Sequence, residues 1–183
     1  MRRREAKLIL SNRDSTGCSR LTIPQEGRRI KWLKQRRRGE CGPLVLAMIL
    51  RYHGLRVSRS TLNVLCQTSM RGISALRLIQ AARALNCGAI GVRLSSVASG
   101  AIAPPAILHW RPNHYVILEA TCRGHVHLVD PLVGRRLVRT SEAKRRFTGI
   151  AILVSPPQSS RMPHSGIDSQ RWANSPQQRT VLR

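Results

Sequence analysis

The chain has 183 residues, of which 42% are hydrophobic and 3% aromatic, and its 32 Lys and Arg against 8 Asp and Glu give a formal net charge of +24. This length suits one domain with a mostly aliphatic core, and no stretch approaches the roughly 18 to 20 apolar residues of a membrane-spanning helix. The charge would suit nucleic acid, an anionic membrane surface or an acidic peptide as partner, and does not choose among them.

The composition divides the chain into three parts. Residues 1–28 mix Arg with Ser, Asn, Asp and Thr, carry too few apolar residues for a secretory signal, and are expected to form a poorly ordered basic arm. Residues 29–156 carry nearly all of the periodic apolar pattern and are the predicted domain. Residues 157–183 are rich in Ser, Pro, Gln and Arg, which predicts a disordered tail.

Cysteine usage indicates the compartment. The five cysteines are widely spaced and include no Cys-x-x-Cys pair; they are Cys18, Cys41, Cys66, Cys87 and Cys122. This pattern argues against a disulfide framework and fits a reducing cytoplasm.

Three helices are expected in the first half of the domain. Pro43 suits the first turn of a helix, and the run Leu44–Tyr52 is apolar on almost every face, as expected for a central buried helix that ends at Gly54. A second helix is expected to start at Ser58. It would carry three apolar residues, Leu62, Leu65 and Cys66.

Ser74 has the character of an N-cap for the third helix. The apolar stripe predicted for this helix consists of Leu76, Ile79, Ala82 and Leu85. The helix is expected to end at Cys87-Gly88.

Short β-branched runs separated by Gly, Pro and Asn follow, and they predict strands. The predicted strands are Ala89–Leu94, Ala106–Trp110, Tyr115–Ala120, His125–Val129, Arg136–Val138 and Ile150–Val154. A short helix is expected at Ser141–Phe147 before the last strand. Helices followed by a mostly antiparallel sheet predict an α+β domain.

Cys41 is the candidate nucleophile. It stands at the start of the first predicted helix, where unpaired N–H groups and the positive end of the helix dipole favour a thiolate, and the arginines at 36–38 add positive potential. The alternative is a small buried core residue, since free cysteines are usually that. A catalytic role requires a base nearby.

His114 is the candidate base because it is expected to face Asp130. Tyr115–Ala120 and His125–Val129 are interpreted as one hairpin with Thr121, Cys122 and Arg123 as its loop. With Cys122 at the loop centre, His114 lies directly opposite Asp130, about 5 Å away between Cβ atoms. In such a set the carboxylate orients the imidazole, the imidazole takes the thiol proton, and the thiolate attacks.

Gln35 is the candidate oxyanion donor. A side-chain amide commonly assists a backbone N–H in binding the oxyanion of acyl transfer, and Gln35 lies six residues before Cys41. A lone glutamine in a basic loop is otherwise solvated, so its interpretation depends on the cysteine.

Four stretches, in order, resemble the bacteriocin-processing cysteine peptidases. They are Q-R-R-R-G-E-C-G-P-L-V-L-A-M-I-L-R-Y-H-G, G-I-S-A-L-R-L-I-Q-A-A-R-A-L, P-A-I-L-H-W-R-P-N-H-Y-V-I-L and H-L-V-D-P-L-V-G. These peptidases are papain-like domains of peptidase-containing ABC transporters that remove double-glycine leader peptides from cargo. The resemblance covers roughly residues 29 to 156. It implies that Cys41 is the nucleophile, His114 the base and acid, Asp130 the orienting partner and Gln35 the oxyanion donor.

The resemblance also implies partners and a location. The expected substrate is a precursor peptide with a double-glycine leader, and the expected partner is an ABC transporter. The chain contains no spanning segment and no G-x-x-x-x-G-K-[ST] phosphate loop. It is therefore interpreted as a free-standing peptidase, a component of a separate transporter, or a truncated gene product. It would act in the cytoplasm or at the inner face of the membrane. A non-cleaving cargo-binding adaptor is the alternative function.

Two other patterns were weighed against this interpretation. His125 and His127 share a strand face near Cys122 and Asp130, but H-x-H alone is a weak zinc pattern, so no metal or other cofactor is expected. Arginines 2–4 and 36–38 lack the interleaved aromatic residues or motifs of a nucleic-acid site, so no nucleic acid is expected as partner.

Overall fold

The structure is a computed structural model that describes residues 29–97 and 100–157. The predicted arm at 1–28 and nearly all of the predicted tail at 157–183 lie outside the described residues. The helices are α1 (Cys41–Tyr52), α2 (Arg59–Leu65), α3 (Ala75–Ala84) and α4 (Thr140–Arg146). The strands are β1 (Cys87–Arg93), β2 (Ala106–Trp110), β3 (His114–Cys122), β4 (His125–Asp130), β5 (Gly134–Arg139) and β6 (Phe147–Pro157).

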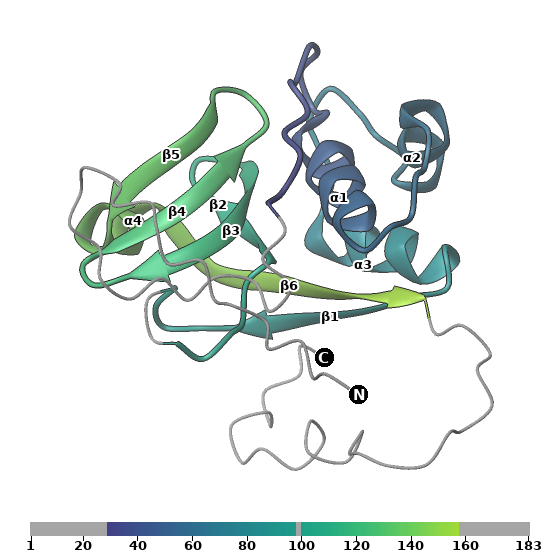
Figure 1. Cartoon of the computed structure of the whole chain (residues 1–183). Coiled ribbons are helices and arrows are strands. Elements are labelled where there is room, and N and C mark those ends of the chain that lie inside the picture. Colours follow the sequence, from purple (N-terminus) through teal and green to yellow (C-terminus); the bar gives the residue numbers. More distant parts are fainter. Residues whose placement is uncertain (1–28, 98–99, 158–183) are drawn as a thin grey trace, which may run out of the picture.

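The strands form one six-stranded sheet in the order β1-β6-β2-β3-β4-β5, and each pairing between neighbours is antiparallel. Helices α1, α2 and α3 gather on one side of the molecule, while α4 lies at the far end beside β5 (Figure 1). Strand β6 pairs with both β1 and β2, which extends it well beyond the predicted Ile150–Val154. The predicted α+β architecture, with helices packed on an antiparallel sheet, is confirmed.

Helix α1 is the centre of the larger of two cores. Every residue of α1 except Arg51 is buried, as its all-round apolar sequence predicts. Full burial of a side chain such as Leu46 or Ile49 contributes about 1.5–3 kcal/mol to the free energy of unfolding. The second core contains Leu108, Leu128 and other residues, and it includes Ala143 of α4. Both cores contain β2, β3 and β4 residues, so the sheet separates two apolar layers.

Helices α2 and α3 begin at the predicted residues. The Ser58 side chain accepts from the Thr61 N–H, and the Ser74 side chain accepts from the Arg77 N–H. The predicted stripe of α3 is partly wrong, because Leu76 is 62% exposed while Leu78 is buried.

The predicted end of α3 at Cys87-Gly88 is also wrong. The helix ends at Ala84, and Asn86 adopts a φ of 59°, in the left-handed region that stops a helix. Cys87 and Gly88 then open β1.

The predicted register of the β3–β4 hairpin is wrong by a few residues. Cys122 pairs with His125, so Cys122 lies in the strand and the turn consists of Arg123 and Gly124 alone. Gly124 has a φ of 77°, which a two-residue hairpin turn favours and which glycine adopts without strain. The pairing of β3 and β4 also shifts between Leu118 and Ala120. Because of this shift, Glu119 has no opposite residue on β4 and forms a β-bulge.

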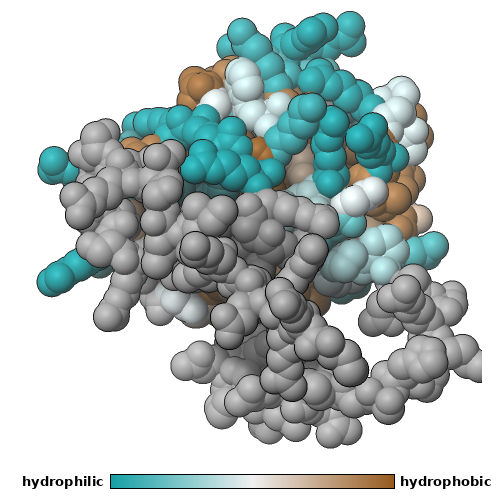
Figure 2. Space-filling model, in the orientation of Figure 1, coloured by the Kyte–Doolittle hydropathy of each residue, from teal (hydrophilic) through white to brown (hydrophobic). Residues whose placement is uncertain are grey.

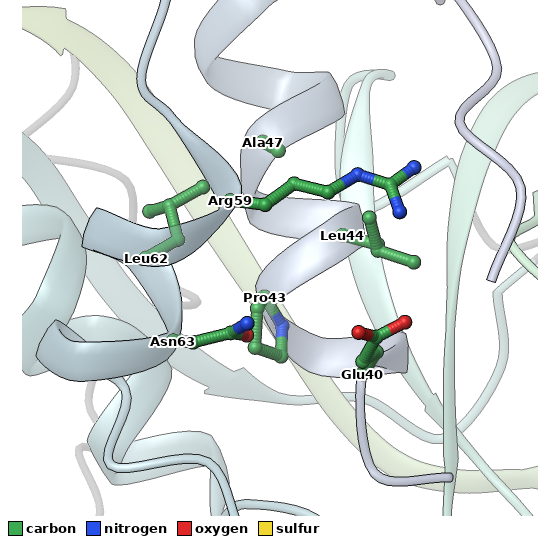
Figure 3. Close-up of a pocket in the computed structure, with 7 residues that line it drawn as sticks. All are labelled: Glu40, Pro43, Leu44, Ala47, Arg59, Leu62 and Asn63. Carbon is green, nitrogen blue, oxygen red and sulfur yellow. The ribbon is translucent and has the colours of Figure 1, made fainter. Parts of the chain in front are cut away.

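On the face seen in Figure 2, the coloured surface is mostly hydrophilic, with apolar areas between and beside the polar ones. None of the helices in residues 29–97 and 100–157 has the length and apolar character needed to cross a bilayer. A shallow hollow lies between the start of α1 and α2 (Figure 3). Its lining consists of Glu40, Pro43, Leu44, Ala47, Arg59, Leu62 and Asn63. It contains none of the predicted catalytic residues, so it is not their site.

Candidate active site

Cys41 is the first residue of α1, and its surroundings fix it there. The Glu40 carboxylate accepts hydrogen bonds from the N–H groups of Arg36 and Arg37, which closes the preceding turn. Gly39 has a φ of 80°, and a Cβ there would lie 2.1 Å from the Ser69 carbonyl oxygen, so only glycine fits. Cys41 is 6% exposed. Its thiol therefore lies at the helix N-terminus, in a site shielded from water.

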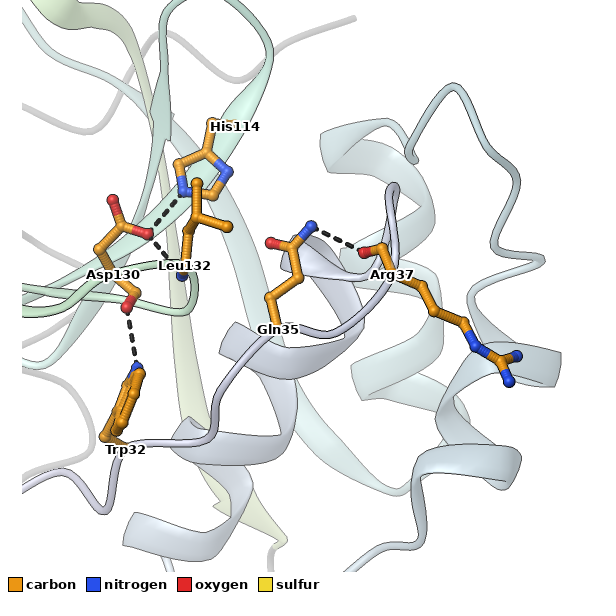
Figure 4. Close-up of polar contacts among 6 residues, drawn as sticks. All are labelled: Trp32, Gln35, Arg37, His114, Asp130 and Leu132. Atoms are coloured by element: carbon orange, nitrogen blue, oxygen red, sulfur yellow. Dashed lines mark hydrogen bonds and ion pairs between the residues drawn. The ribbon is translucent and has the colours of Figure 1, made fainter.

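His114 and Asp130 are in contact although they do not pair directly in the sheet. Ile117 pairs with Val129, so continuing that register leaves His114 diagonal to Asp130. The imidazole bridges the diagonal, and its Nε2 lies 2.8 Å from Oδ1 of Asp130 (Figure 4). The same Oδ1 accepts the Leu132 N–H at 2.8 Å. The carboxylate oxygen is therefore held by two hydrogen bonds, one with the imidazole of His114 and one from the backbone of its own turn.

His114 also interacts with the side chain of Cys41, which completes a Cys–His–Asp series. Burial has the largest influence on the pKa of His114 and lowers it. The hydrogen bonds to Asp130 and Cys41, together with their charges, act in the opposite direction and raise this pKa to about 9. The imidazole is thus held in its protonated form at neutral pH.

The Asp130 carboxylate is stabilised in its ionised form. Burial raises its pKa, but hydrogen bonds from His114 and Leu132 and the charges of His114 and Arg136 lower it, and the net pKa is below the ordinary value. The ionised carboxylate is suited to stabilising an imidazolium.

Tyr115 lies close enough to Cys41 to respond to its charge. Burial raises the pKa of Tyr115 well above its usual value, and the Cys41 charge raises it further. Its hydroxyl donates to the Ile73 carbonyl at 3.1 Å, and Ile73 packs on Gly42 beside the cysteine. The neutral phenol thus anchors the 69–73 loop against the start of α1. Sequence reasoning did not single out Tyr115.

Gln35 lies beside the Cys–His–Asp series, but its amide is already engaged. Its backbone N–H donates to the Pro131 carbonyl at 2.7 Å, and its Nε2 donates to the Arg37 carbonyl at 2.8 Å. Its Oε1 is buried and has no hydrogen-bond partner among the described residues. Figure 4 shows this oxygen on the side of His114 and the nitrogen on the side of Arg37.

The other histidines near the sheet lie apart from this series. His109 contacts the Thr148 hydroxyl at 3.0 Å, and His127 Nε2 lies 3.8 Å from the Cys122 sulfur. No group of three or more His, Cys, Asp or Glu side chains within residues 29–97 and 100–157 is arranged to hold a metal ion. Asp130, which lies near the His125–His127 pattern considered for zinc, is hydrogen-bonded to His114.

Comparison with known proteins adds a family to this geometry. Residues 29–159 match the model of the Peptidase C39 family. The chain is 34% identical over 129 residues to the probable microcin-H47 secretion/processing ATP-binding protein MchF of Escherichia coli. That match covers 70% of this chain and 18% of MchF, so the chain spans less than a fifth of this relative's length.

Solved structures share the fold. A double-glycine motif protease from an AMS/PCAT transporter, in complex with the leader peptide, matches with a TM-score of 0.66 and 32% identity, over 70% of this chain and 94% of that one. The peptidase domain of Streptococcus ComA, a bifunctional ABC transporter involved in a quorum-sensing pathway, matches with a TM-score of 0.65. It is 24% identical and covers 69% of this chain and 98% of that domain. The predicted papain-like fold is confirmed.

Proposed function

We propose that this chain, which belongs to the peptidase C39 family, is a cysteine peptidase that removes a double-glycine leader from a precursor peptide. The resemblance to the bacteriocin-processing peptidases predicted from the four sequence stretches is confirmed by the family match. One observation carries the proposal: His114 is hydrogen-bonded to Asp130 on the sheet and interacts with Cys41 at the start of α1, so the three residues meet where the helices adjoin the sheet.

The first half of the reaction is acylation of Cys41. Because His114 Nε2 is bonded to Asp130, the other ring nitrogen, Nδ1, is left to hold the thiol proton. The thiolate sulfur attacks the carbonyl carbon of the scissile bond. The carbon–nitrogen bond of the tetrahedral species then breaks, and His114 gives its proton to the leaving amine. The products are a thioester on Cys41 and the free cargo amine.

The second half is hydrolysis of the thioester. Neutral His114 now removes a proton from water, and the resulting hydroxide attacks the thioester carbonyl. Breaking the carbon–sulfur bond returns the thiolate and releases the leader as a carboxylic acid. Asp130 stabilises the imidazolium in both halves without being protonated itself.

Gln35 is the proposed side-chain donor to the oxyanion. One N–H of its amide is used by the Arg37 carbonyl, so the oxyanion takes the second N–H or the amide turns about its last bond. The buried and unpartnered Oε1 makes such a turn less costly, since the present orientation leaves that oxygen without a hydrogen bond.

Replacing Gln35 with Ala should lower kcat by about 10² to 10³, because that is the typical loss when one oxyanion donor is removed. The fold should remain, since the backbone N–H of residue 35 still bonds Pro131. Steady-state kinetics measure the effect, and Gln35→Glu, which supplies no N–H when ionised, is expected to be equally slow. A Gln35→Ala variant with wild-type kcat would remove this residue from the oxyanion site.

Apolar side chains beside the site support a peptide substrate. Leu132 and Val133 follow the Asp130 turn and are 56% and 59% exposed. Met70 is 75% exposed in the 69–72 turn, which the Asn113 side chain holds next to His114 by a bond to Arg71. Exposed large apolar residues that lie near one another are typical of a binding surface. They would receive apolar side chains of the leader.

The proposed partner is an ABC exporter, and the proposed place of action is the cytoplasm at the inner face of the membrane. The relative MchF is described as a secretion/processing ATP-binding protein, and this chain corresponds to 18% of it. Within the described residues, Cys41, Cys66 and Cys87 are free thiols, which fits a reducing compartment. Cargo processed there would then pass to the exporter.

The test uses the full chain and synthetic precursor peptides with a Gly-Gly junction. Mass spectrometry should show one cut directly after the second glycine, and a matched peptide with Ala-Ala at the junction should stay intact. Binding of the leader without any cut, under conditions that keep Cys41 reduced, would instead support the adaptor function.

A further inference from the structure

A short segment that precedes α1, residues 30–35, is hydrogen-bonded to the sheet, and we call it the strap. Ile30 at its beginning is fully buried. The Ile30 N–H donates to Oε1 of Glu119 at 2.9 Å, and its carbonyl accepts from Nη2 of Arg135. Glu119 and Arg135 form an ion pair with each other at 3.1 Å. Both backbone polar groups of Ile30 are therefore held by one ion pair.

The other end of the strap bonds the turn that carries the Asp130 carboxylate. The Trp32 indole N–H donates to the backbone carbonyl of Asp130 at 2.9 Å (Figure 4). The Gln35 N–H donates to the next carbonyl, that of Pro131, at 2.7 Å. Gly134 lies beside the indole, and a Cβ there would make an ordinary contact with the ring at 3.9 Å.

Trp32 and the carboxylate of Asp130 are connected through the hydrogen-bonded turn at residues 130–132. Asp130 Oδ1 accepts from the Leu132 N–H, so the backbone of residues 130–132 dictates where the carboxylate points. Trp32 holds that backbone from one side, and His114 contacts the carboxylate from the other. A small shift of the turn would move the carboxylate away from the imidazole.

We propose that Trp32 is a positioning residue, whose indole N–H fixes the Asp130 turn so that the carboxylate stays in contact with His114. Glu119 and Arg135 support this role by fixing the strap at Ile30. The inference deepens the proposed function, because the catalytic consequence depends on His114 acting in the reaction. The same strap carries Gln35 and leads into Cys41, so it ties the helix side of the site to the sheet side.

A purely structural role makes a different prediction. If Trp32 only filled space, Phe at this position would lower the free energy of unfolding but leave the site unchanged in the folded molecules. If its N–H positions Asp130, Phe keeps an aromatic ring at the position but loses the donor, and the site itself changes. Misplacement by about 1 Å is enough to cost on the order of 10²-fold in rate, so a partial shift should be visible.

The test compares Trp32→Phe with the wild-type full chain. We expect kcat to fall about tenfold with KM changed by less than about twofold, because positioning acts on the chemical step. Imidazole NMR titration, which needs no substrate, should show the pKa of His114 below its wild-type value of about 9, because a weaker contact with Asp130 raises it less. Unchanged kcat and an unchanged pKa of His114 would overturn the inference.

Val138→Ala is the control for lost stability. Val138 is buried in the other core, on β5, where it pairs with Val126 of β4. This variant should unfold more easily yet keep the wild-type kcat per folded molecule and the wild-type pKa of His114. The same change of pKa in Val138→Ala as in Trp32→Phe would count against a positioning role.

Arg135→Lys supplies a second test that does not alter the indole. Lysine keeps the charge but lacks the fork that contacts both Glu119 and Ile30, so the strap loosens and the same two measurements should change in the same direction by less. If Trp32→Phe does not fold, this variant decides the question. If the wild-type chain cleaves no Gly-Gly peptide, the proposed function fails, and the titration of His114 still tests the positioning.

Discussion

Cys41→Ala is expected to abolish cleavage of a Gly-Gly peptide while leaving the fold and leader binding in place. Losing a peptidase nucleophile costs on the order of 10⁶ in kcat, which no other residue in the site replaces. The substitution removes one sulfur atom from the first turn of α1, where the side chain is already shielded from water. The free energy of unfolding should therefore change by no more than about 1 kcal/mol.

Cys66→Ala is the matched control for this prediction. Cys66 is fully buried at the end of α2, and burial raises the pKa of its thiol to about 11, so it carries almost no thiolate at neutral pH. The same chemical change there should leave kcat intact. A Cys66→Ala variant as inactive as Cys41→Ala would show that the loss reflects packing and not chemistry.

Selective alkylation gives an independent measurement of the same prediction. A small iodoacetamide reagent should label Cys41 before Cys66 and Cys87, whose thiol pKa values are both raised by burial. Because Cys122 is partly exposed, it is replaced by Ser beforehand. Peptide mapping by mass then resolves the labelled positions. Labelling of Cys66 or Cys87 first would contradict an activated Cys41.

Local signals in the sequence predicted the helices well. The apolar run after Cys41 has no polar face, so it had to lie in the middle of the domain, and α1 does. Ser58 and Ser74 are caps because a serine hydroxyl satisfies an N–H that the helix leaves open, which is a property of a few neighbouring residues. The stripe of α3 was less well predicted. Which side of a helix is buried depends on the packing of α3 against β1.

The hairpin shows how a correct contact arose from an incorrect register. Residue pairing depends on the length of the turn and on the bulge at Glu119, and neither has a firm signal in the sequence. His114 still contacts Asp130, because diagonal neighbours in a sheet lie about 7–8 Å apart, within reach of an imidazole and a carboxylate together. The contact between the two residues was predicted from the sequence, but its geometry was not.

The strap was missed although one residue signalled it. Glu119 is an acidic residue inside the apolar run of β3, and a buried carboxylate requires a charged or hydrogen-bonding partner. Its partners are Arg135, 16 residues later, and Ile30, 89 residues earlier. Partners at such separations depend on the complete sheet, so the sequence predicts that a partner exists without identifying it.

His114→Ala is expected to lower kcat by about 10² to 10⁴, because that is the typical contribution of a positioned general acid and base. Cleavage assays at saturating peptide measure this loss. His127→Ala is the control, since His127 is also a β-strand histidine but lies by Cys122 and not by Asp130. If His127→Ala were inactive and His114→Ala active, the assignment of the base would be wrong.

Asp130→Asn should be less damaging than His114→Ala. The amide oxygen of asparagine still accepts a hydrogen bond from the imidazole, so the ring keeps its orientation. The negative charge that stabilises the imidazolium is lost, and with it part of the increase in the pKa of His114. An Asp130→Asn variant slower than His114→Ala would indicate that the carboxylate does more than orient the ring.

The pH dependence follows from the raised pKa of His114. The working pair is a thiolate and an imidazolium, so wild-type activity should fall as pH rises through about 9, where the imidazolium loses its proton. In Asp130→Asn this alkaline fall should move to lower pH.

The free energy of unfolding should also depend on the protonation of His114. A folded-state pKa above the unfolded value of about 6.5 stabilises the fold fully below pH 6.5, and that contribution disappears as pH rises through about 9. The difference in unfolding free energy between the wild type and His114→Ala should therefore shrink between these two pH values. A difference that grew over this range would contradict a His114 protonated at neutral pH.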